Sequence, residues 1–184
     1  MDLTEEKVSS EEIFSGRVVH LVRDTVRLPN GALTTREVVH HPGAVCVVPL
    51  TDDGDVVMVR QFRYPFGRVL LEAPAGKLDP GESPLDCARR ELSEETGAEA
   101  EMFEDLGEFY SSVAIFDESI RLFLARGLKF KSAHADDDEF LQVERIPLKT
   151  LVSDVLSGKI RDGKTQAALL KVWCLEREKL KCPD

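Results

Sequence analysis

The chain contains 184 residues, of which 42% are hydrophobic and 32% are charged, and its formal net charge at pH 7 is −10. This length and composition predict one globular domain with a sizeable core, or one domain with a small addition. The apolar residues are too dispersed for a bilayer-spanning segment, and the acidic balance argues against a nucleic-acid-binding protein, whose affinity comes from clustered Lys and Arg.

The N-terminal stretch and the cysteines indicate the compartment. MDLTEEKVSSEEIF is acidic and lacks the features of a signal peptide or a transit peptide, so we expect a cytoplasmic protein. The cysteines are far apart and contain no C-x-x-C pair, which argues against a zinc ribbon, a redox motif or a disulfide framework. Reduced thiols are expected at Cys46, Cys87, Cys174 and Cys182.

Stretches rich in β-branched residues predict four strands early in the chain. Residues 17–28 and 32–41 are joined by Pro-Asn-Gly, and because Asn-Gly favours a tight turn we predict a β-hairpin. Residues 44–50 and 55–63 flank the turn cluster Thr-Asp-Asp-Gly, and their apolar density indicates buried strands. The next apolar stretch, 69–74, enters a loop rich in glycine and carboxylates.

The loop leads to a helix that we predict over residues 84–96. Ser83 can cap its first turn, Pro84 suits a position that needs no N–H donor, and Asp86 favours the positive end of the helix dipole. Gly97 provides the left-handed residue that commonly ends a helix. Spacings of three and four predict a buried stripe made of Leu85, Ala88 and Leu92.

The second half of the chain continues the mixed pattern. Residues 106–112 and 120–128 are predicted strands, and residues 131–139 are a polar acidic loop. Helical periodicity returns at 147–157 and 165–179. Strands combined with three helices predict an α/β sandwich, with the N-terminal hairpin as an appendage.

The helix at 84–96 gathers three glutamates, Glu91, Glu94 and Glu95. Like charges at this spacing destabilise an exposed helix by roughly 0.2–0.5 kcal/mol per pair, so a compensating interaction is expected. One interpretation is a solvated face balanced by the adjacent arginines. The alternative is a metal site, because a turn before the helix can bring backbone carbonyls and a further carboxylate to the same face. That turn contains Gly76, Gly81 and Glu82.

These residues resemble the signature of the Nudix hydrolases, G-x5-E-x7-R-E-U-x-E-E-x-G-U, where U is a bulky aliphatic residue. The matching positions are Gly76, Glu82, Arg90, Glu91, Leu92, Glu94, Glu95 and Gly97. Only Ala98 departs, because it is smaller than the pattern prefers. The resemblance implies a Nudix-type α/β/α sandwich with a mixed sheet and an N-terminal β-hairpin extension. It also implies hydrolysis of a nucleoside diphosphate linked to another group, with the help of divalent cations.

The resemblance assigns roles to individual residues. Mg²⁺ or Mn²⁺ is expected to bind the side chains of Glu91, Glu94 and Glu95 and the backbone carbonyl of Ala75. The same three glutamates belong to the expected catalytic set, together with Glu139, which would position or deprotonate the attacking water unless it is a solvated loop residue. The site is expected to be braced by Gly76, Glu82, Arg90 and Gly97.

The flanking sequence narrows the branch of the family. Residues 60–82 and 36–45 resemble the ADP-ribose pyrophosphatase branch, which also includes other nucleotide-sugar pyrophosphatases. In that branch an N-terminal β region often exchanges with a partner to complete a dimer. Residues 1–42 are therefore expected to be a dimerising β extension, and residues 43–184 the Nudix hydrolase domain.

Within this branch two arginines are expected to bind substrate. Arg63 would contact the diphosphate and Arg36 the nucleotide, because arginine suits bidentate phosphate contact; a surface salt bridge is the alternative for each. Phe14 is a candidate for stacking on the base. Relatives commonly show S-P-G-F-x-D-E after the signature, whereas this chain has SVAIFDE at 112–118, which changes the backbone preference of a loop near the substrate.

Together these patterns predict Mg²⁺-dependent hydrolysis of the pyrophosphate bond of ADP-ribose or a related nucleoside diphosphate sugar, giving a nucleoside monophosphate and a sugar phosphate. The expected partners are this small-molecule substrate and a second copy of the chain in a homodimer, without nucleic acid or membrane. The alternatives are a pyrophosphatase for another nucleotide sugar such as GDP-mannose, a non-catalytic ADP-ribose-binding sensor, and a structural interaction domain.

Overall fold

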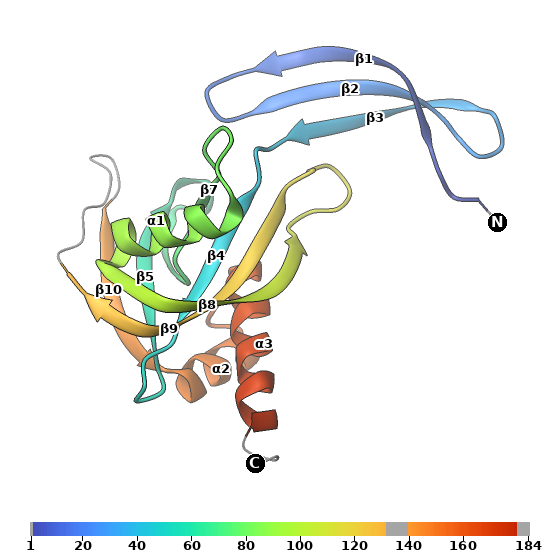
Figure 1. Ribbon diagram of the computed structural model, residues 1–184. Helices are drawn as coiled ribbons and strands as arrows, with labels where there is room; N and C mark the ends of the chain where they lie inside the picture. Colours follow the sequence, from blue (N-terminus) through green and yellow to red (C-terminus); the bar gives the residue numbers. More distant parts are fainter. Residues whose placement is uncertain (1, 132–139, 180–184) are drawn as a thin grey trace. The chain divides into compact units, whose positions relative to one another are not determined.

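The computed structural model describes residues 2–131 and 140–179, and the chain folds into two compact units (Figure 1). One unit consists of Met1–Gly43 and Tyr110–Ser119, and the other of Ala44–Phe109 and Ile120–Asp184. Within the described residues, no helix is long and apolar enough to cross a membrane. The described cysteines, Cys46, Cys87 and Cys174, are free thiols.

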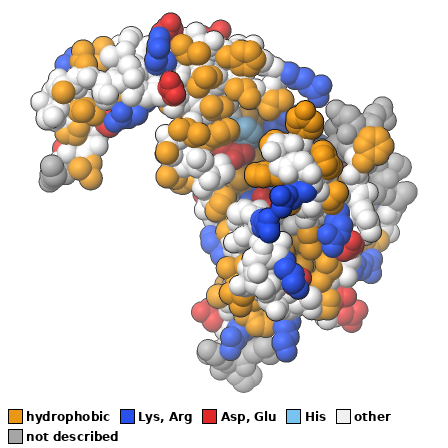
Figure 2. All heavy atoms as spheres, turned by 180° about the vertical axis from the view of Figure 1, so that it is seen from behind, with side chains coloured by type: hydrophobic (Ala, Val, Ile, Leu, Met, Phe, Trp, Pro, Cys, Tyr) orange, Lys and Arg blue, Asp and Glu red, His pale blue; other side chains and the backbone are white. Residues whose placement is uncertain are grey.

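The first unit is a three-stranded antiparallel sheet in the order β1-β2-β3. Its strands are β1 (Glu6–Ser15), β2 (His20–Arg27) and β3 (Leu33–His40). The predicted hairpin is confirmed, because β2 pairs with β3 across a turn in which Gly31 has a φ of 87°. Hydrophobic side chains are visible on the surface of this sheet (Figure 2), and the exposed ones include Val8, Ile13, Phe14 and Leu33.

Strand β1 is absent from the predicted elements, because its sequence EKVSSEEIFS is mostly polar and its side chains are exposed along its whole length. The strand pairs with β2 through the backbone, and cross-strand ion pairs support it. Lys7 Nζ lies 3.1 Å from Asp24 Oδ2, and Arg23 Nη2 lies 2.6 Å from Glu11 Oε2. Cross-strand pairing therefore makes a strand of residues that show no core-facing pattern.

The described part of the second unit contains two sheets and three α-helices. The sheet β10-β5-β6 is antiparallel, and the sheet β7-β4-β9-β8 is mixed because β4 and β9 run parallel. The strands are β4 (Ala44–Pro49), β5 (Asp55–Arg63), β6 (Arg68–Glu72), β7 (Ala75–Lys77), β8 (Ala98–Tyr110), β9 (Ser119–Phe130) and β10 (Leu141–Pro147). The helices are α1 (Pro84–Thr96), α2 (Leu148–Leu156) and α3 (Gly163–Lys179), with a short 3-10 helix, η1 (Tyr64–Phe66).

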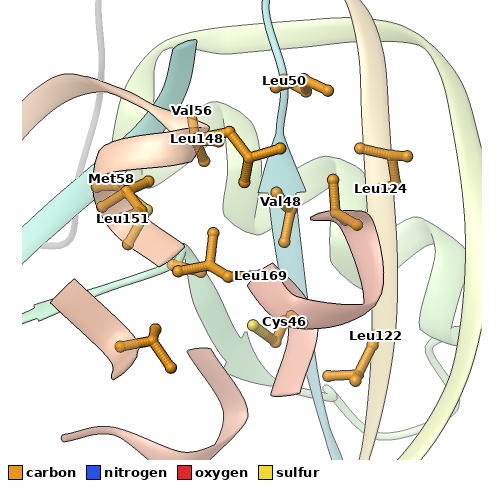
Figure 3. Packing of buried hydrophobic residues seen from close by; sticks show 14 of the residues in the cluster. Cys46, Val48, Leu50, Val56, Met58, Leu122, Leu124, Leu148, Leu151 and Leu169 are labelled. Carbon is orange, nitrogen blue, oxygen red and sulfur yellow. The ribbon is translucent and has the colours of Figure 1, made fainter. Parts of the chain in front are cut away.

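Strand β4 is buried on both faces and separates two hydrophobic clusters. Because side chains alternate along a strand, Cys46 and Val48 point to one face and pack with residues of α2 and α3, as Figure 3 shows for Leu151 and Leu169. The alternate residues of β4 pack on the other face with α1, in a cluster that includes Leu92. Helices on both faces of a mixed sheet form the predicted α/β/α sandwich.

Helix α1 has the predicted bounds, because Ser83 caps its N-terminus and Gly97 ends it, as the sequence predicts. Ser83 Oγ accepts a hydrogen bond from the Asp86 N–H at 3.2 Å, and Gly97, with a φ of 68°, ends the helix. The predicted buried stripe is only partly right, since Leu85 is half-buried. The buried residues of α1 are Cys87, Ala88, Leu92, Glu95 and Thr96. One of the three gathered glutamates is therefore an interior residue.

β8 and α3 differ from the prediction at their N-terminal ends, as does β2, which begins at His20 instead of residue 17. β8 begins at Ala98 instead of residue 106, because its first half, AEAEMFED, alternates charged and uncharged residues on an edge strand and resembles a loop in composition. α3 begins at Gly163 instead of residue 165. Asp162 Oδ2 accepts a hydrogen bond from the Thr165 N–H at 2.9 Å, so the carboxylate caps the first turn of the helix.

Candidate active site

Strand β7 contains a glycine that no other residue can replace without displacing a carboxylate. A Cβ atom built on Gly76 would lie 1.9 Å from both Cδ and Oε1 of Glu91. Gly76 does not have a positive φ, so the requirement is the close approach of the Glu91 carboxylate and not backbone conformation. The strand β7 and the glutamate face of α1 are thus in direct contact.

Arg90 joins the loop to the helix. Its Nε and Nη2 atoms donate to the two carboxylate oxygens of Glu82, each at 2.9 Å, and Nη2 also donates to the Lys77 carbonyl at 3.1 Å. Its Nη1 atom donates to Glu91 Oε1 at 2.8 Å and to Glu94 Oε2 at 3.0 Å. A single guanidinium therefore contacts three carboxylates, which compensates for their mutual repulsion.

The contacts of Arg90 shift the pKa values of Glu82 and of Arg90 itself. The hydrogen bonds from Arg90 and from the Asp79 backbone lower the pKa of Glu82 to about 2. The hydrogen bonds that Arg90 donates to Glu82 and Glu91 raise its own pKa well above the ordinary value, although burial acts in the opposite direction. Glu82 and Arg90 are therefore ionised at every physiological pH. Their role in bracing the site stays a prediction.

Glu95 is 4% exposed and lies at the interior end of the glutamate face. Its Oε2 atom accepts a hydrogen bond from the backbone N–H of Ala75 at 3.1 Å. Ala75 in turn pairs with Cys46 of the buried strand β4. The Glu95 carboxylate is thereby fixed against the residue whose carbonyl is a predicted metal ligand.

The donor set of this site fits a hard divalent cation, because carboxylate and backbone oxygens are the groups such ions prefer. The contact between the Glu91 carboxylate and Gly76 places one donor against the backbone of β7, and the bond from Ala75 places a second one beside it. In the described ranges, no three His, Cys, Asp or Glu side chains are already arranged around a common metal position. Glu91 and Glu94 contact Arg90 instead.

A second charged cluster surrounds Glu72 at the end of β6. Arg63 Nε and Nη2 donate to Glu72 Oε1 and Oε2 at 2.7 and 2.8 Å. Lys164 Nζ donates to Glu72 Oε2 at 2.7 Å and forms an ion pair with Asp162 Oδ1 at 3.0 Å. Burial alone would raise the pKa of Glu72, but the hydrogen bond from Arg63 and the charge of Lys164 lower it to about 2.

Sequence reasoning named Arg63 but missed Glu72, Lys164 and Asp162. The available signal is a glutamate inside the apolar stretch VLLEAP, since a carboxylate is rarely buried without a charged partner. The partner from α3 is distant in sequence, and no local pattern identifies it. Thr165 completes the link between α3 and the β6 end, because its Oγ1 accepts a hydrogen bond from the Ala73 N–H at 2.9 Å.

The other predicted site residues are placed differently. Arg36 lies on β3 in the first unit, where its Nη2 donates to Glu5 Oε1 at 2.5 Å. Phe14 lies on β1 of the same unit and is exposed. Glu139 lies outside the described residues. Their roles in substrate binding and catalysis stay predictions.

Comparisons with known proteins agree with this geometry. Residues 40–169 match the NUDIX domain, and residues 5–39 match the nucleoside diphosphate sugar hydrolase N-terminal domain. The chain is 43% identical to the ADP-ribose pyrophosphatase of Bacillus subtilis (strain 168), over 91% of each chain. It is 45% identical to the methanol dehydrogenase activator of Bacillus methanolicus, over 91% of this chain and 92% of that one.

More distant proteins are similar along nearly the full length. The GDP-mannose pyrophosphatase of Pectobacterium atrosepticum is 31% identical over 94% of this chain and 96% of its own. A solved structure described as "Crystal structure of ADP compounds hydrolase" is 25% identical, with a TM-score of 0.84, and the match covers 98% of this chain and 97% of that one.

Proposed function

Because the chain belongs to the Nudix hydrolase family, we propose that it hydrolyses the pyrophosphate bond of ADP-ribose or a related nucleoside diphosphate sugar in a reaction that requires Mg²⁺ or Mn²⁺. The products are a nucleoside monophosphate and a sugar phosphate. The observation that carries the proposal is the pair of carboxylates held against β7, with Glu91 against Gly76 and Glu95 bonded to the Ala75 N–H.

Glu91 and Glu95 are the proposed principal metal ligands, with Glu94 and the Ala75 carbonyl as further donors. A bound divalent cation neutralises pyrophosphate charge and acidifies a water molecule. The protein's part is to hold the carboxylates in place, which the Arg90 contacts to Glu91 and Glu94 support. Glu82 in turn holds Arg90, so the ligands stay aligned when substrate enters.

Arg63 is the proposed contact for the substrate diphosphate. Its side chain is 37% exposed, and arginine can bind two phosphate oxygens at once. In hydrolysis the water oxygen forms a bond to one phosphorus, the bridging phosphorus–oxygen bond breaks, and the proton of the water passes to a general base. Glu139 is the proposed base, as the resemblance implies.

ADP-ribose is the first candidate because of the 43% identity with an ADP-ribose pyrophosphatase. GDP-mannose is the second candidate, because a relative similar along nearly the full length is named GDP-mannose pyrophosphatase. The sequence SVAIFDE at 112–118, which lacks the proline and glycine of many relatives, favours testing both. The two substrates share the diphosphate and the chemistry and differ in base and sugar.

We also propose that the chain acts as a homodimer joined through its N-terminal sheet. The exposed hydrophobic residues of β1 and the adjoining turn support this, because an apolar sheet surface commonly marks an interface. They include Val8, Ile13, Phe14, Val18 and Val19. Light scattering in solution tests the proposal, and a monomer mass would contradict it.

The function is tested by phosphate-coupled turnover on ADP-ribose, GDP-mannose, UDP-glucose and NADH, each with Mg²⁺ and with a chelator. Metal-dependent preference for ADP-ribose is the expected result. Preference for GDP-mannose would change the substrate and keep the mechanism. If no substrate of the panel is turned over and ADP-ribose still raises the thermal stability, the non-catalytic sensor is favoured, since a ligand that binds the folded state raises its stability.

A further inference from the structure

The charged cluster around Glu72 is separate from the proposed metal ligands and suggests a further role. We propose that Glu72 and Lys164 are positioning residues, which hold the Arg63 guanidinium in the orientation in which it binds the substrate diphosphate. This inference rests on the proposed function. Neither residue is part of the Nudix signature, and they lie 92 positions apart in the sequence. The inference rests on the hydrogen-bond geometry and on the difference in burial along the cluster.

The Arg63–Glu72 contact fixes which edge of the guanidinium is available. Arg63 uses Nε and one Nη2 hydrogen for the carboxylate, which are two of the five N–H donors of an arginine. The guanidinium is planar, so the remaining donors, on Nη1 and Nη2, point away from Glu72. The side chain of Glu72 is 3% exposed and that of Arg63 is 37% exposed. The guanidinium edge that does not contact Glu72 therefore lies at the solvent-accessible end of the pair.

Lys164 fixes the carboxylate itself. Its ammonium group bonds to Glu72 Oε2, the same oxygen that accepts from Arg63 Nη2, and its side chain is only 14% exposed. Asp162 contacts the other side of the ammonium group at 3.0 Å. The four charges therefore alternate from Arg63 at the accessible end to Asp162, and Glu72 cannot rotate without breaking contacts to two cations.

The cluster is also tied to the carboxylate face of α1. Thr165 Oγ1 donates to Asp162 Oδ2 at 2.5 Å and accepts from the Ala73 N–H at 2.9 Å. Two residues further along, the Ala75 N–H donates to Glu95 Oε2. The short segment 72–76 thus carries the anchor of Arg63 at one end and the contacts to Glu95 and Glu91 at the other, which sets the distance between the two groups.

A second arginine fork on the same strand provides the matched control. Arg60 Nε and Nη2 donate to Glu144 Oε1 and Oε2 at 2.5 and 3.2 Å. Arg60 and Arg63 are three residues apart on β5, so they point to opposite faces of the strand. The Arg60–Glu144 pair has the same side-on geometry, no lysine among the described residues is paired with Glu144, and Glu144 is 25% exposed.

The test compares Glu72→Gln, Lys164→Met and Arg63→Gln with the control Glu144→Gln. The readouts are KM and kcat on the best substrate of the panel and the dissociation constant of ADP by titration calorimetry with Mg²⁺. We expect Glu72→Gln to raise KM and the ADP dissociation constant about tenfold, with kcat within about threefold, and Lys164→Met to act in the same direction. Glu144→Gln should leave all three values within about twofold.

A double-mutant cycle separates positioning from a structural role. If Glu72 acts through Arg63, adding Glu72→Gln to Arg63→Gln has no further effect on ADP binding. Additive losses, or unchanged ADP binding in a folded Glu72→Gln protein, would overturn the inference. Should Glu72→Gln fail to fold, Lys164→Met combined with Arg63→Gln gives the same cycle. If the wild-type protein turns over no substrate of the panel, the proposed function is overturned instead. The two failures are distinguishable, because ADP binding tests the cluster independently of turnover.

Discussion

The arginine–glutamate forks at Arg90 and at Arg63 have the same geometry and different surroundings. In each fork the Nε and Nη2 atoms bind the two oxygens of one carboxylate, Arg90 with Glu82 and Arg63 with Glu72. Arg90 contacts further carboxylates on α1, so the acidic charge exceeds the basic charge around it. Glu72 instead contacts a second cation, Lys164. The first cluster suits a divalent cation, and the second suits an arginine that binds phosphate.

The two clusters also differ in how the sequence encodes them. Arg90 and Glu82 are eight residues apart, in a loop and the helix that follows it. Lys164 reaches Glu72 from the start of α3, and in the described part of the chain four strands and two helices lie between β6 and α3. The first cluster is a local motif, whereas the second exists only once α3 packs against the sheet. The four predictions that follow test the different roles of the two clusters.

The largest expected effect is at the carboxylate cluster. Glu95→Gln should lower Mg²⁺-dependent turnover about a thousandfold, because an amide is a poor ligand for a hard cation and cannot replace the charge. The amide oxygen can still accept from the Ala75 N–H, so the fold should persist, which circular dichroism checks. Glu99→Gln, at an exposed residue paired with Lys131, is the control. Wild-type turnover by Glu95→Gln would remove Glu95 from the site.

Gly76→Ala should lower turnover about a hundredfold. The added Cβ would meet the Glu91 carboxylate at 1.9 Å, so the carboxylate must move away, and a misplacement of about 1 Å is sufficient for such a loss. Gly163→Ala is the matched control, since its Cβ would meet only Phe109 at an ordinary 3.5 Å. Steady-state kinetics of both variants make the comparison. Equal activity of both would contradict the close contact between β7 and α1.

The Glu72 cluster should make stability depend on pH in the acid range. The pKa of Glu72 falls from the ordinary 4.5 to about 2 on folding, so its contribution is complete above pH 4.5 and is lost as the pH falls toward 2. The loss should reach roughly 2 kcal/mol at pH 3 relative to pH 7. Urea unfolding of wild type and Glu72→Gln at both values measures it. Parallel pH dependences in the two proteins would contradict the low pKa.

The smallest expected effect is at the brace of the first cluster. Glu82→Gln should lower turnover about tenfold and raise the Mg²⁺ concentration needed for half-maximal activity, because Arg90 would lose one ionic partner while its contacts to Glu91 and Glu94 remain. Glu101→Gln, which breaks an exposed pair with Lys129, is the control. An unchanged Mg²⁺ requirement would mean that Glu82 stabilises the loop without aligning the ligands.

The sequence alone determined the features that depend on neighbouring residues. Helix α1 has its predicted bounds because Ser83 and Gly97 act within one turn of its ends. The carboxylate cluster was predictable for the same reason, since loop and helix are consecutive. The two packed clusters of the core also follow from local apolar density, because β4 is apolar at nearly every position and must be covered on both faces.

Only the tertiary structure decided the features that depend on contacts between different elements. β1 is a strand because β2 pairs with it, although its own residues show no buried face. Glu95 is interior where α1 packs against β7, and its carboxylate accepts a hydrogen bond from the Ala75 N–H. Glu72 has two cationic partners because α3 packs against the end of β6. In each case the deciding contact is made by a residue of another element, and the pattern within the element itself carries no information about that neighbour.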